Sequence, residues 1–186
     1  MNTEIQNALE VLQNGGIILY PTDTVWGIGC DASNEEAVKK VHALKQREES
    51  KSMIVLMNNE KMLYNVFRTL PEVVWDVIDS SDKPITVILD NPKNVAANLI
   101  AEDNSLGVRI VKDPFCYKLM ERLKRPLVST SANLTGMFAP KSFKEISPEI
   151  LKGVDYVVNL HKDKVCKNPS TIIKLGLDSQ VKIIRK

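Results

Sequence analysis

The hydrophobic positions along this chain follow two different periodicities. Apolar residues recur every three or four positions from Thr3 to Gly15 and again from Ser33 to Leu44. This spacing predicts two amphipathic helices, with Thr3 and Ser33 as their caps. The remaining apolar positions form short continuous runs, which are typical of buried strands. These runs are residues 17–20, 53–57, 85–90, 106–111, 126–131, 156–160, 170–175 and 181–186.

Helical spacing returns between several of these runs. Residues 59–80 indicate two short helices with Pro71 in the first turn of the second, and Asp113–Pro114 opens a helix that continues to about Leu123. A further helix is expected near 142–152. Helices that separate β-branched runs are typical of the α/β class, so we expect a twisted mixed sheet with flanking helices.

The composition of the 186 residues limits the class of protein. Hydrophobic residues make up 44% of the chain, and 25 Lys and Arg residues against 23 Asp and Glu residues leave a net charge of +2. The length suits one domain of ordinary size or two very small ones, and the composition excludes a disordered chain. A net charge near zero also excludes an overall electrostatic grip on nucleic acid, so strong phosphate binding has to come from a local cluster of cations.

The three cysteines, Cys30, Cys116 and Cys166, are far apart and form no CxxC pair. They match neither a metal site nor a disulfide framework, which favours a reducing compartment and a cytoplasmic protein. No apolar run is long enough to span a bilayer and no signal peptide is visible, so we expect no membrane association.

One nucleotide-binding fingerprint is matched but does not fit its surroundings. Residues 27–32 match the dinucleotide motif G-x-G-x-x-A. That motif begins directly after a strand and runs into its helix, whereas here the expected strand ends at Tyr20 and the next helix begins at Ser33. We therefore interpret Gly27 and Gly29 as positions where the backbone passes close to another group.

Three clusters of polar residues follow predicted elements and could bind a small polar or anionic molecule. They are residues 21–24, the cations Lys45, Arg47 and Lys51, and residues 129–133. Hydroxyls after a buried strand commonly lie at the mouth of an α/β sheet, and a local set of cations suits phosphate. Each cluster also has an ordinary interpretation: a turn, a solvated helix end or a strand-to-loop turn. Ser170 and Thr171 are equally ambiguous, and His42, on a charged helix, is expected in solvent.

Arg109 differs from the other cations because it lies inside the apolar run 106–111. A buried arginine requires an anionic partner. That partner is either a carboxylate of the protein, in an ion pair, or a carboxylate of a substrate, which the guanidinium would hold with two hydrogen bonds.

Five short motifs follow one another along the chain, and they carry more information together than singly. They are Pro-Thr-Asp-Thr-Val-Trp-Gly at 21–27, Lys45-x-Arg47-x-x-x-Lys51, Gly107-Val-Arg109, Ser-Thr-Ser-Ala-Asn at 129–133 and Pro-Ser-Thr-Ile-Ile at 169–173. Together they resemble the YrdC-like family, whose characterised members are threonylcarbamoyl-AMP synthases. The resemblance extends from the first helix to the last strand. Trp26 stands where the family usually has tyrosine, and Leu56 stands where some members have histidine.

The resemblance implies a single concave α/β domain over residues 1–186, folded around a basic cavity. The family reaction converts L-threonine, bicarbonate and ATP into threonylcarbamoyl-AMP, pyrophosphate and water, with Mg²⁺ accompanying ATP. The product supplies a tRNA threonylcarbamoyl transferase system, which modifies the adenosine beside the anticodon. The implied partners are therefore the three substrates and the downstream transferase proteins, with a weak contact to tRNA as a further expectation.

The resemblance also implies roles for individual residues. Three cations are expected to act catalytically at the phosphates: Lys45, Arg47 and Lys51. Four residues are expected to bind threonine: Thr24, Arg109 (which clamps its carboxylate), Ser129 and Ser170. The residues expected to bind ATP are Arg47, Lys51, Ser105, Ser131, Asn133 and Arg185. The reaction requires no protein nucleophile, which agrees with the lack of a nucleophile motif in the sequence.

Two other functions are open from the sequence. The first is a member of the same family that acts on another carboxylated or carbamoylated substrate, although the retained Lys45-x-Arg47 and Ser131-x-Asn133 argue against it. The second is an RNA- or nucleotide-binding module, which would bind its ligand with a steep salt dependence.

Overall fold

Strands and helices alternate along most of the chain. The computed structural model describes residues 1–46, 53–80, 82–166 and 169–185. The strands are β1 (Ile18–Tyr20), β2 (Gly27–Gly29), β3 (Ile54–Met57), β4 (Ile85–Asp90), β5 (Ser105–Ile110), β6 (Leu127–Ser131), β7 (Tyr156–Val157), β8 (Thr171–Leu175) and β9 (Val181–Arg185). The α-helices are α1 (Asn2–Gln13), α2 (Glu35–Leu44), α3 (Glu60–Val66), α4 (Val74–Asp79), α5 (Pro114–Leu123) and α6 (Pro148–Gly153), and two 3₁₀ turns are η1 (Ala97–Leu99) and η2 (Phe143–Glu145).

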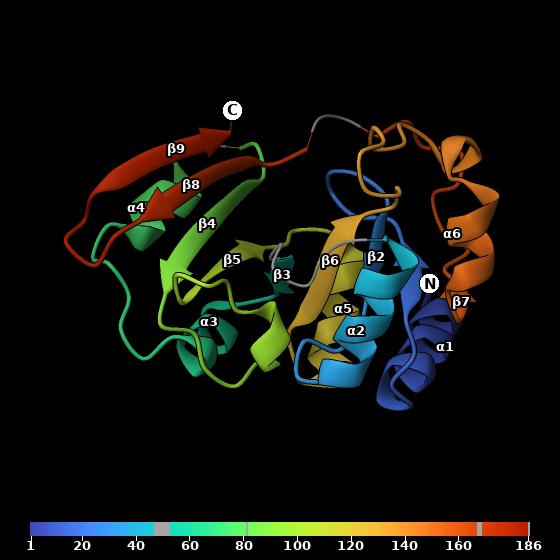
Figure 1. The fold of residues 1–186 in the computed structure, drawn as a ribbon, viewed down its shortest axis with the longest axis horizontal. Coiled ribbons are helices and arrows are strands. Elements are labelled where there is room, and N and C mark those ends of the chain that lie inside the picture. Colours follow the sequence, from blue (N-terminus) through green and yellow to red (C-terminus); the bar gives the residue numbers. More distant parts are fainter. Residues whose placement is uncertain (47–52, 81, 167–168, 186) are drawn as a thin grey trace.

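The strands form one twisted mixed sheet, as expected from the sequence. Over the described residues its order is β7-β1-β2-β6-β3-β5-β4-β8-β9. The pairs β1–β7, β3–β5 and β4–β8 are parallel, and the other neighbours are antiparallel. β8 and β9 lie at one end of the sheet and β1 and β2 lie towards the other, with β3 and β5 between them (Figure 1).

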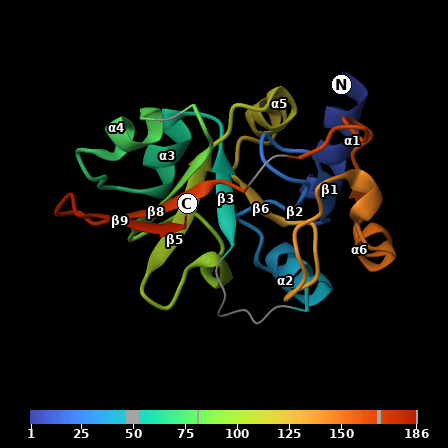
Figure 2. The same ribbon diagram turned by 90° about the horizontal axis from the view of Figure 1, so that it is seen from above.

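The hydrophobic core occupies both faces of the sheet because successive strand residues point to opposite sides. Tyr20 and Leu56 belong to the cluster beneath α1 and α5, whereas their neighbours Leu19 and Val55 belong to the cluster that includes the inner face of α2. α1 and α5 lie together on one side of the sheet and α2 lies on the other (Figure 2). Burying a side chain of this size stabilises the fold by about 1.5–3 kcal/mol, so the two clusters supply its main driving force.

Several local expectations were wrong at the helix ends. Asn34 rather than Ser33 caps α2, because its side chain accepts the hydrogen bond of Ala37 N while Ser33 is held by Asp31. α1 already begins at Asn2, before Thr3. Ser and Asn are both good capping residues, so their competition is decided by the neighbouring carboxylate and not by propensity.

Three further expectations need correction. The single helix near 142–152 is two segments, η2 and α6, because Pro148 can only occupy the first turn of a helix. Pro71 precedes α4, and its carbonyl accepts a hydrogen bond from Val74 N. His42 is 2% exposed on the inner face of α2, and is therefore not a solvent histidine.

Gly27 and Gly29 form the short strand β2, which the glycine-rich sequence did not predict. β2 lies between β1 and β6. A Cβ atom at Gly29 would clash with the backbone oxygen of Val128. The glycines therefore allow a close approach between backbones, as expected, and the group they approach is the neighbouring strand β6.

Candidate functional site

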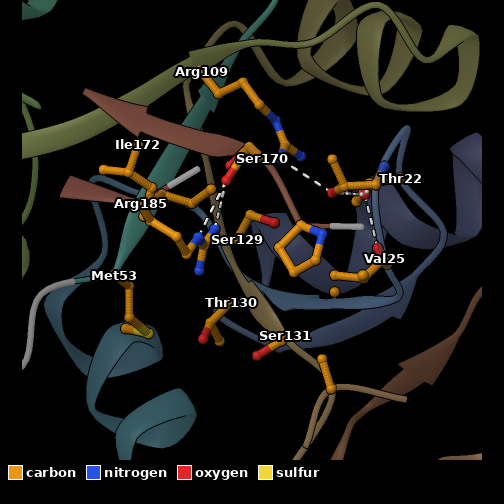
Figure 3. A pocket seen from close by; sticks show the side chains of 15 residues that line it. Thr22, Val25, Met53, Arg109, Ser129, Thr130, Ser131, Ser170, Ile172 and Arg185 are labelled. Carbon is orange, nitrogen blue, oxygen red and sulfur yellow. Dashed lines mark hydrogen bonds between the residues drawn. The ribbon is translucent and has the colours of Figure 1, made fainter. Parts of the chain in front are cut away.

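A cavity of about 270 Å³ opens where the β1–β2 loop, the end of β6 and the β8–β9 pair face one another (Figure 3). Its walls carry hydroxyls, two guanidinium groups and a few apolar side chains. The lining residues are Thr22, Thr24, Val25, Gly27, Met53, Ile54, Arg109, Ser129, Thr130, Ser131, Ala139, Pro169, Ser170, Ile172 and Arg185. Four of the five family-like segments therefore meet at one cavity. Of the cationic segment from 45 to 51, only Lys45 and residue 46 belong to the described residues, and neither lines the cavity.

Arg109 is a buried cation of the cavity. It pairs with a carboxylate of the protein and also has room for an anionic ligand. It lies on β5 beside Leu56 of β3 and is 3% exposed. Its Nη2 lies 3.1 Å from Asp23 Oδ1, and its Nη1 donates to Thr24 Oγ1 at 3.1 Å. Its Nε is buried and has no hydrogen-bond partner among the described residues. The guanidinium is thus oriented from two sides and retains donor capacity for an anion in the cavity.

The turn between β1 and β2 supports this guanidinium. Thr22 and Thr24 are both buried, and their hydroxyl oxygens lie 3.0 Å apart. Thr22 Oγ1 donates to Val25 O at 2.7 Å and accepts from Thr24 N at 3.0 Å. Because Pro21 and the polar residues after it cannot continue the strand, the chain turns at this point and directs the hydroxyls towards β5.

Arg185 and Ser170 form the opposite wall. The Nε and Nη2 atoms of Arg185 donate to Ser170 O at 3.2 and 2.8 Å. The Ser170 hydroxyl lies 2.7 Å from Thr86 Oγ1, which is buried in β4. Burial, followed by the positive charge of Arg109, lowers the pKa of Arg185. Two guanidinium groups that face one small cavity favour an anionic ligand.

The end of β6 supplies Ser129 and Ser131, and a buried lysine holds the loop that follows. Lys45 lies at the end of α2 and is 2% exposed. Its ammonium group donates to Ser131 O and, at 2.7 Å, to Asn133 O. The side-chain amide of Asn133 donates to Leu134 O and Met137 O, at 2.9 and 2.7 Å. Lys45 and Asn133 therefore organise the rim of the cavity without lining it.

The structure separates other predicted residues from the cavity. Ser105 is buried at the start of β5, where its hydroxyl donates to Asp103 Oδ1 at 2.5 Å. It lies four positions before Arg109 on the same strand, about 13 Å along an extended backbone, so it does not line the cavity. Arg47 and Lys51 lie outside the described residues, and their expected contacts with phosphate stay predictions.

Three supporting residues had not been assigned a role from the sequence. Thr22 and Asp23 belong to the polar cluster after β1, of which only Thr24 had been assigned. Thr86 is a polar residue in the interior of the apolar run 85–90, and it contacts Ser170. The same signal, a polar residue within a buried strand, had drawn attention to Arg109, and it was also present at Thr86.

The described part of the chain shows no metal cluster and no membrane-spanning helix. There, no group of three or more His, Cys, Asp or Glu side chains is arranged to hold a metal ion. None of the helices in the same residues is both long and apolar enough to cross a bilayer. Cys30, Cys116 and Cys166 are all free thiols.

The comparison with known families agrees with the motif order. The model of the Sua5/YciO/YrdC family, described as "Telomere recombination", matches residues 10–186. This chain belongs to the Sua5/YciO/YrdC family. The resemblance drawn from the sequence is thereby confirmed.

Two individual relatives are similar to this chain over most of their length. A protein of Methanocaldococcus jannaschii is 37% identical over 186 residues, which cover 97% of this chain and 86% of that protein. The threonylcarbamoyl-AMP synthase of Enterobacter sp. strain 638 is 34% identical over 171 residues, 90% of this chain and 89% of the relative.

A solved structure shares the fold. The crystal structure of Sua5 from P. abyssi complexed with L-threonine superposes with a TM-score of 0.83 at 23% identity, over 94% of this chain. The match covers 52% of that protein, so this chain corresponds to about half of the Sua5 chain.

Proposed function

We propose that this protein is a threonylcarbamoyl-AMP synthase, which joins L-threonine, bicarbonate and ATP and releases pyrophosphate. The observation that carries the proposal is the buried guanidinium of Arg109, which faces a small hydroxyl-lined cavity with its Nε unpartnered. A named synthase at 34% identity and a family structure complexed with L-threonine support the choice of substrate.

The chemistry proceeds in two bond-forming steps. The deprotonated amine of L-threonine attacks the carbon of bicarbonate, and loss of water leaves a carbamate. A carbamate oxygen then attacks the α-phosphorus of ATP, and pyrophosphate leaves with the pair of electrons of the broken P–O bond. Neither step forms a bond to the protein, so its residues have to orient the reactants and offset their charge.

The described residues can both orient the reactants and offset their charge. Arg109 holds the threonine carboxylate, and Ser129 and Ser170 lie on the walls of the same cavity. Arg185 is positioned at the rim to offset phosphate charge. Two like charges 4 Å apart repel by about 4 kcal/mol at an effective dielectric of 20, so bringing a carboxylate, a carbamate and a triphosphate together requires several cations. We expect Arg47 and Lys51 to be among them.

A volume of about 270 Å³ suits an amino acid and part of a nucleotide, so the adenosine of ATP has to lie on the rim. The loop that carries Ser131 and Asn133, held by Lys45, lies at this rim. We expect it to bind the nucleotide through backbone groups as well as side chains.

Mg²⁺ fits this scheme as a companion of ATP. No carboxylate is among the described residues that line the cavity, and Asp23, next to the lining residue Thr24, is paired with Arg109. Triphosphate oxygens and water are the ligands that Mg²⁺ commonly keeps in such sites. When bound, the ion would neutralise charge on the phosphates. Removal of divalent ions by EDTA is therefore expected to abolish product formation while leaving L-threonine binding unchanged.

The proposed reaction is tested by incubating the protein with ATP, Mg²⁺, L-threonine and labelled bicarbonate, followed by rapid chromatography. We expect label in an adenylate whose formation requires both L-threonine and bicarbonate. Replacing L-threonine by L-valine, which has nearly the same shape but no hydroxyl, tests the choice of amino acid. Failure to form a labelled adenylate, in a preparation that still binds ATP, would contradict the proposal and favour a relative with another amine substrate.

The downstream partner is inferred from the chemistry of the product. A mixed anhydride of a carbamate and a phosphate is readily hydrolysed, so we expect a transferase that consumes it promptly for tRNA modification. Direct tRNA binding would be revealed by a salt titration, because each phosphate contact steepens the salt dependence of affinity. Little binding at physiological salt would leave the role of this protein confined to making the adenylate.

A further inference from the structure

We propose that Thr22 is a positioning residue that fixes the direction of a hydrogen-bond chain and thereby holds Arg109 for its anionic ligand. The chain runs from the Arg109 guanidinium through the Thr24 hydroxyl and the Thr22 hydroxyl to the backbone carbonyl of Val25 (Figure 3). The inference rests on the proposed function for the identity of that ligand, L-threonine.

The direction of each hydrogen bond follows from the groups at the two ends. The Val25 carbonyl can only accept, so the single hydroxyl proton of Thr22 is committed to it at 2.7 Å. The short contact between the two hydroxyls then requires Thr24 to be the donor and Thr22 the acceptor. Arginine can only donate, so the Thr24 oxygen accepts from Arg109 Nη1. Every proton in this series of hydrogen bonds therefore points away from Arg109.

Thr22 is fully committed by this arrangement. Its hydroxyl oxygen accepts both from the Thr24 hydroxyl and from Thr24 N, and its proton goes to Val25 O. A side chain with all its hydrogen-bonding capacity used inside the protein has none left for a substrate. Although Thr22 borders the cavity, its part in binding is therefore indirect.

The donor and acceptor roles of the Thr24 hydroxyl are fixed as a result. Its proton is directed to Thr22, so it can offer only an oxygen lone pair towards the cavity. A substrate group that meets Thr24 must then be a donor, and both the ammonium and the hydroxyl of L-threonine are donors. Without Thr22, the Thr24 hydroxyl could rotate, and its oxygen would no longer be held in place for Arg109.

Arg109 is constrained from two directions only when the hydrogen bonds through Thr24 and Thr22 are intact. Asp23 holds Nη2 and Thr24 holds Nη1, and the unpartnered Nε remains for the ligand. With the Thr24 contact loosened, the guanidinium could turn about its contact with Asp23. A guanidinium that has to be ordered on binding gives a weaker site than one that is already ordered.

The first test compares two substitutions at Thr22. Thr22→Val keeps the shape of the side chain and removes the hydroxyl, whereas Thr22→Ser keeps the hydroxyl and removes the methyl group. By calorimetry we expect Thr22→Val to weaken L-threonine binding about tenfold, Thr22→Ser to stay within about twofold of the parent, and ATP affinity to stay within about twofold in both. Thr69→Val, on an exposed loop, controls for the loss of a threonine hydroxyl elsewhere.

Three results would overturn the proposal. One is an unchanged L-threonine affinity in Thr22→Val. Another is a Thr22→Ser protein as weak as Thr22→Val, which would assign the effect to the methyl group. The third is an equal loss of L-threonine and ATP affinity, which would indicate general damage to the fold. If the parent protein itself binds no L-threonine, the proposed function fails, and the positioning role is then decided by the second test.

The second test needs no substrate and starts from the parent protein. Side-chain ¹⁵N NMR of the parent protein reports whether the guanidinium of Arg109 rotates about its Cζ–N bonds. A guanidinium held at Nη1 and Nη2 is expected to show separate, slowly exchanging Nη–H signals. Signals averaged by rapid rotation would contradict the proposal, and so would separate signals that persist unchanged in Thr22→Val.

Discussion

At the scale of single residues, the site depends on polar groups buried within apolar surroundings. Arg109 is 3% exposed, and the ion pair with Asp23 offsets its charge only in part, since the carboxylate contacts one end of the guanidinium. Burying a cation in this way costs free energy that hydrophobic packing at the same position would not. A protein that keeps such a cation beside a cavity is suited to binding an anion there.

Arg109→Ala is expected to weaken L-threonine binding about 10- to 100-fold, because hydrogen bonds to a charged group contribute about 1.5–3 kcal/mol each. ATP affinity should fall by no more than about threefold, since we expect the phosphates to bind towards the rim. Calorimetry with each ligand checks this. Arg109→Lys, which keeps the charge but not the planar fork, should show an intermediate loss. Equal losses for both ligands would remove Arg109 from the amino-acid subsite.

Lys45 illustrates a different use of a buried cation. Its ammonium group holds the carbonyls of Ser131 and Asn133, on a loop that follows it by more than 80 residues. The described contacts show that it supports the loop, and the role at the phosphates that the sequence motif predicts stays a prediction. Both functions depend on the same charge, and the support of the loop requires that the lysine stay buried.

Lys45→Met is expected to lower the free energy of unfolding by about 2–5 kcal/mol, because two partly buried carbonyls lose their partner. ATP affinity should fall with it. Urea denaturation gives the stability, and Lys39→Met on the same helix is the matched control. Lys39 pairs with Glu36 at the surface, where such pairs contribute at most about 1 kcal/mol. Similar values for the two variants would show that Lys45 does not support the loop.

At the scale of elements, the position of β2 depends on its two glycines, which have no side chain. β2 is three residues long, and its close approach to β6 sets the distance between the turn with Thr24 and the serines of β6. A Cβ atom at Gly29 would meet the Val128 backbone oxygen, which cannot move without separating the strands. The geometry of the cavity is therefore tied to this pair of strands.

Gly29→Ala is expected to destabilise the protein by about 3 kcal/mol or more, at the upper end of the range for overpacked sites. Gly107→Ala is the matched control. The added Cβ there meets the Ile54 side chain at 3.2 Å, which can adjust, so a loss of about 1 kcal/mol is expected. Urea unfolding of both variants measures the difference. Equal losses would show that the β2–β6 approach does not control stability.

At the scale of the whole molecule, the two clusters on either side of the sheet leave the three thiols in different environments. Cys30 and Cys116 are fully buried, and Cys166 is half-buried. Burial raises the pKa of all three thiols, most strongly at Cys30 and Cys116. Since only the thiolate reacts, each is less reactive at a given pH than a free cysteine.

We expect a thiol reagent such as DTNB to modify Cys166 alone in the folded protein, and all three thiols in guanidinium chloride. Because a raised pKa moves the thiolate form to higher pH, the rate at Cys166 should still be rising where a free thiol has levelled off. Mass spectrometry after a timed reaction identifies the modified residue. Rapid modification of Cys30 in the folded protein would contradict the packing described for β2.

Prediction from the sequence was most accurate where local pattern decides structure. The boundaries of β4 and α5 agree with the periodicity to within a residue, and Asp113 caps α5 through Cys116 N. The order of motifs was sufficient to recognise the family. The cap of α2 and the strand β2 were missed, because a neighbouring carboxylate and a close backbone contact outweigh local propensity there.

The sequence by itself determined the class of fold, the family and the residue types available for chemistry, since these follow from short-range spacing. Only the tertiary structure decided which of those residues meet. Thr24 and Arg109 are 85 positions apart, and Ser105, only four positions before Arg109, lies elsewhere. The order of the strands and the direction in which each side chain points decide such contacts. Both depend on how the strands pair across the whole sheet, which no local pattern contains.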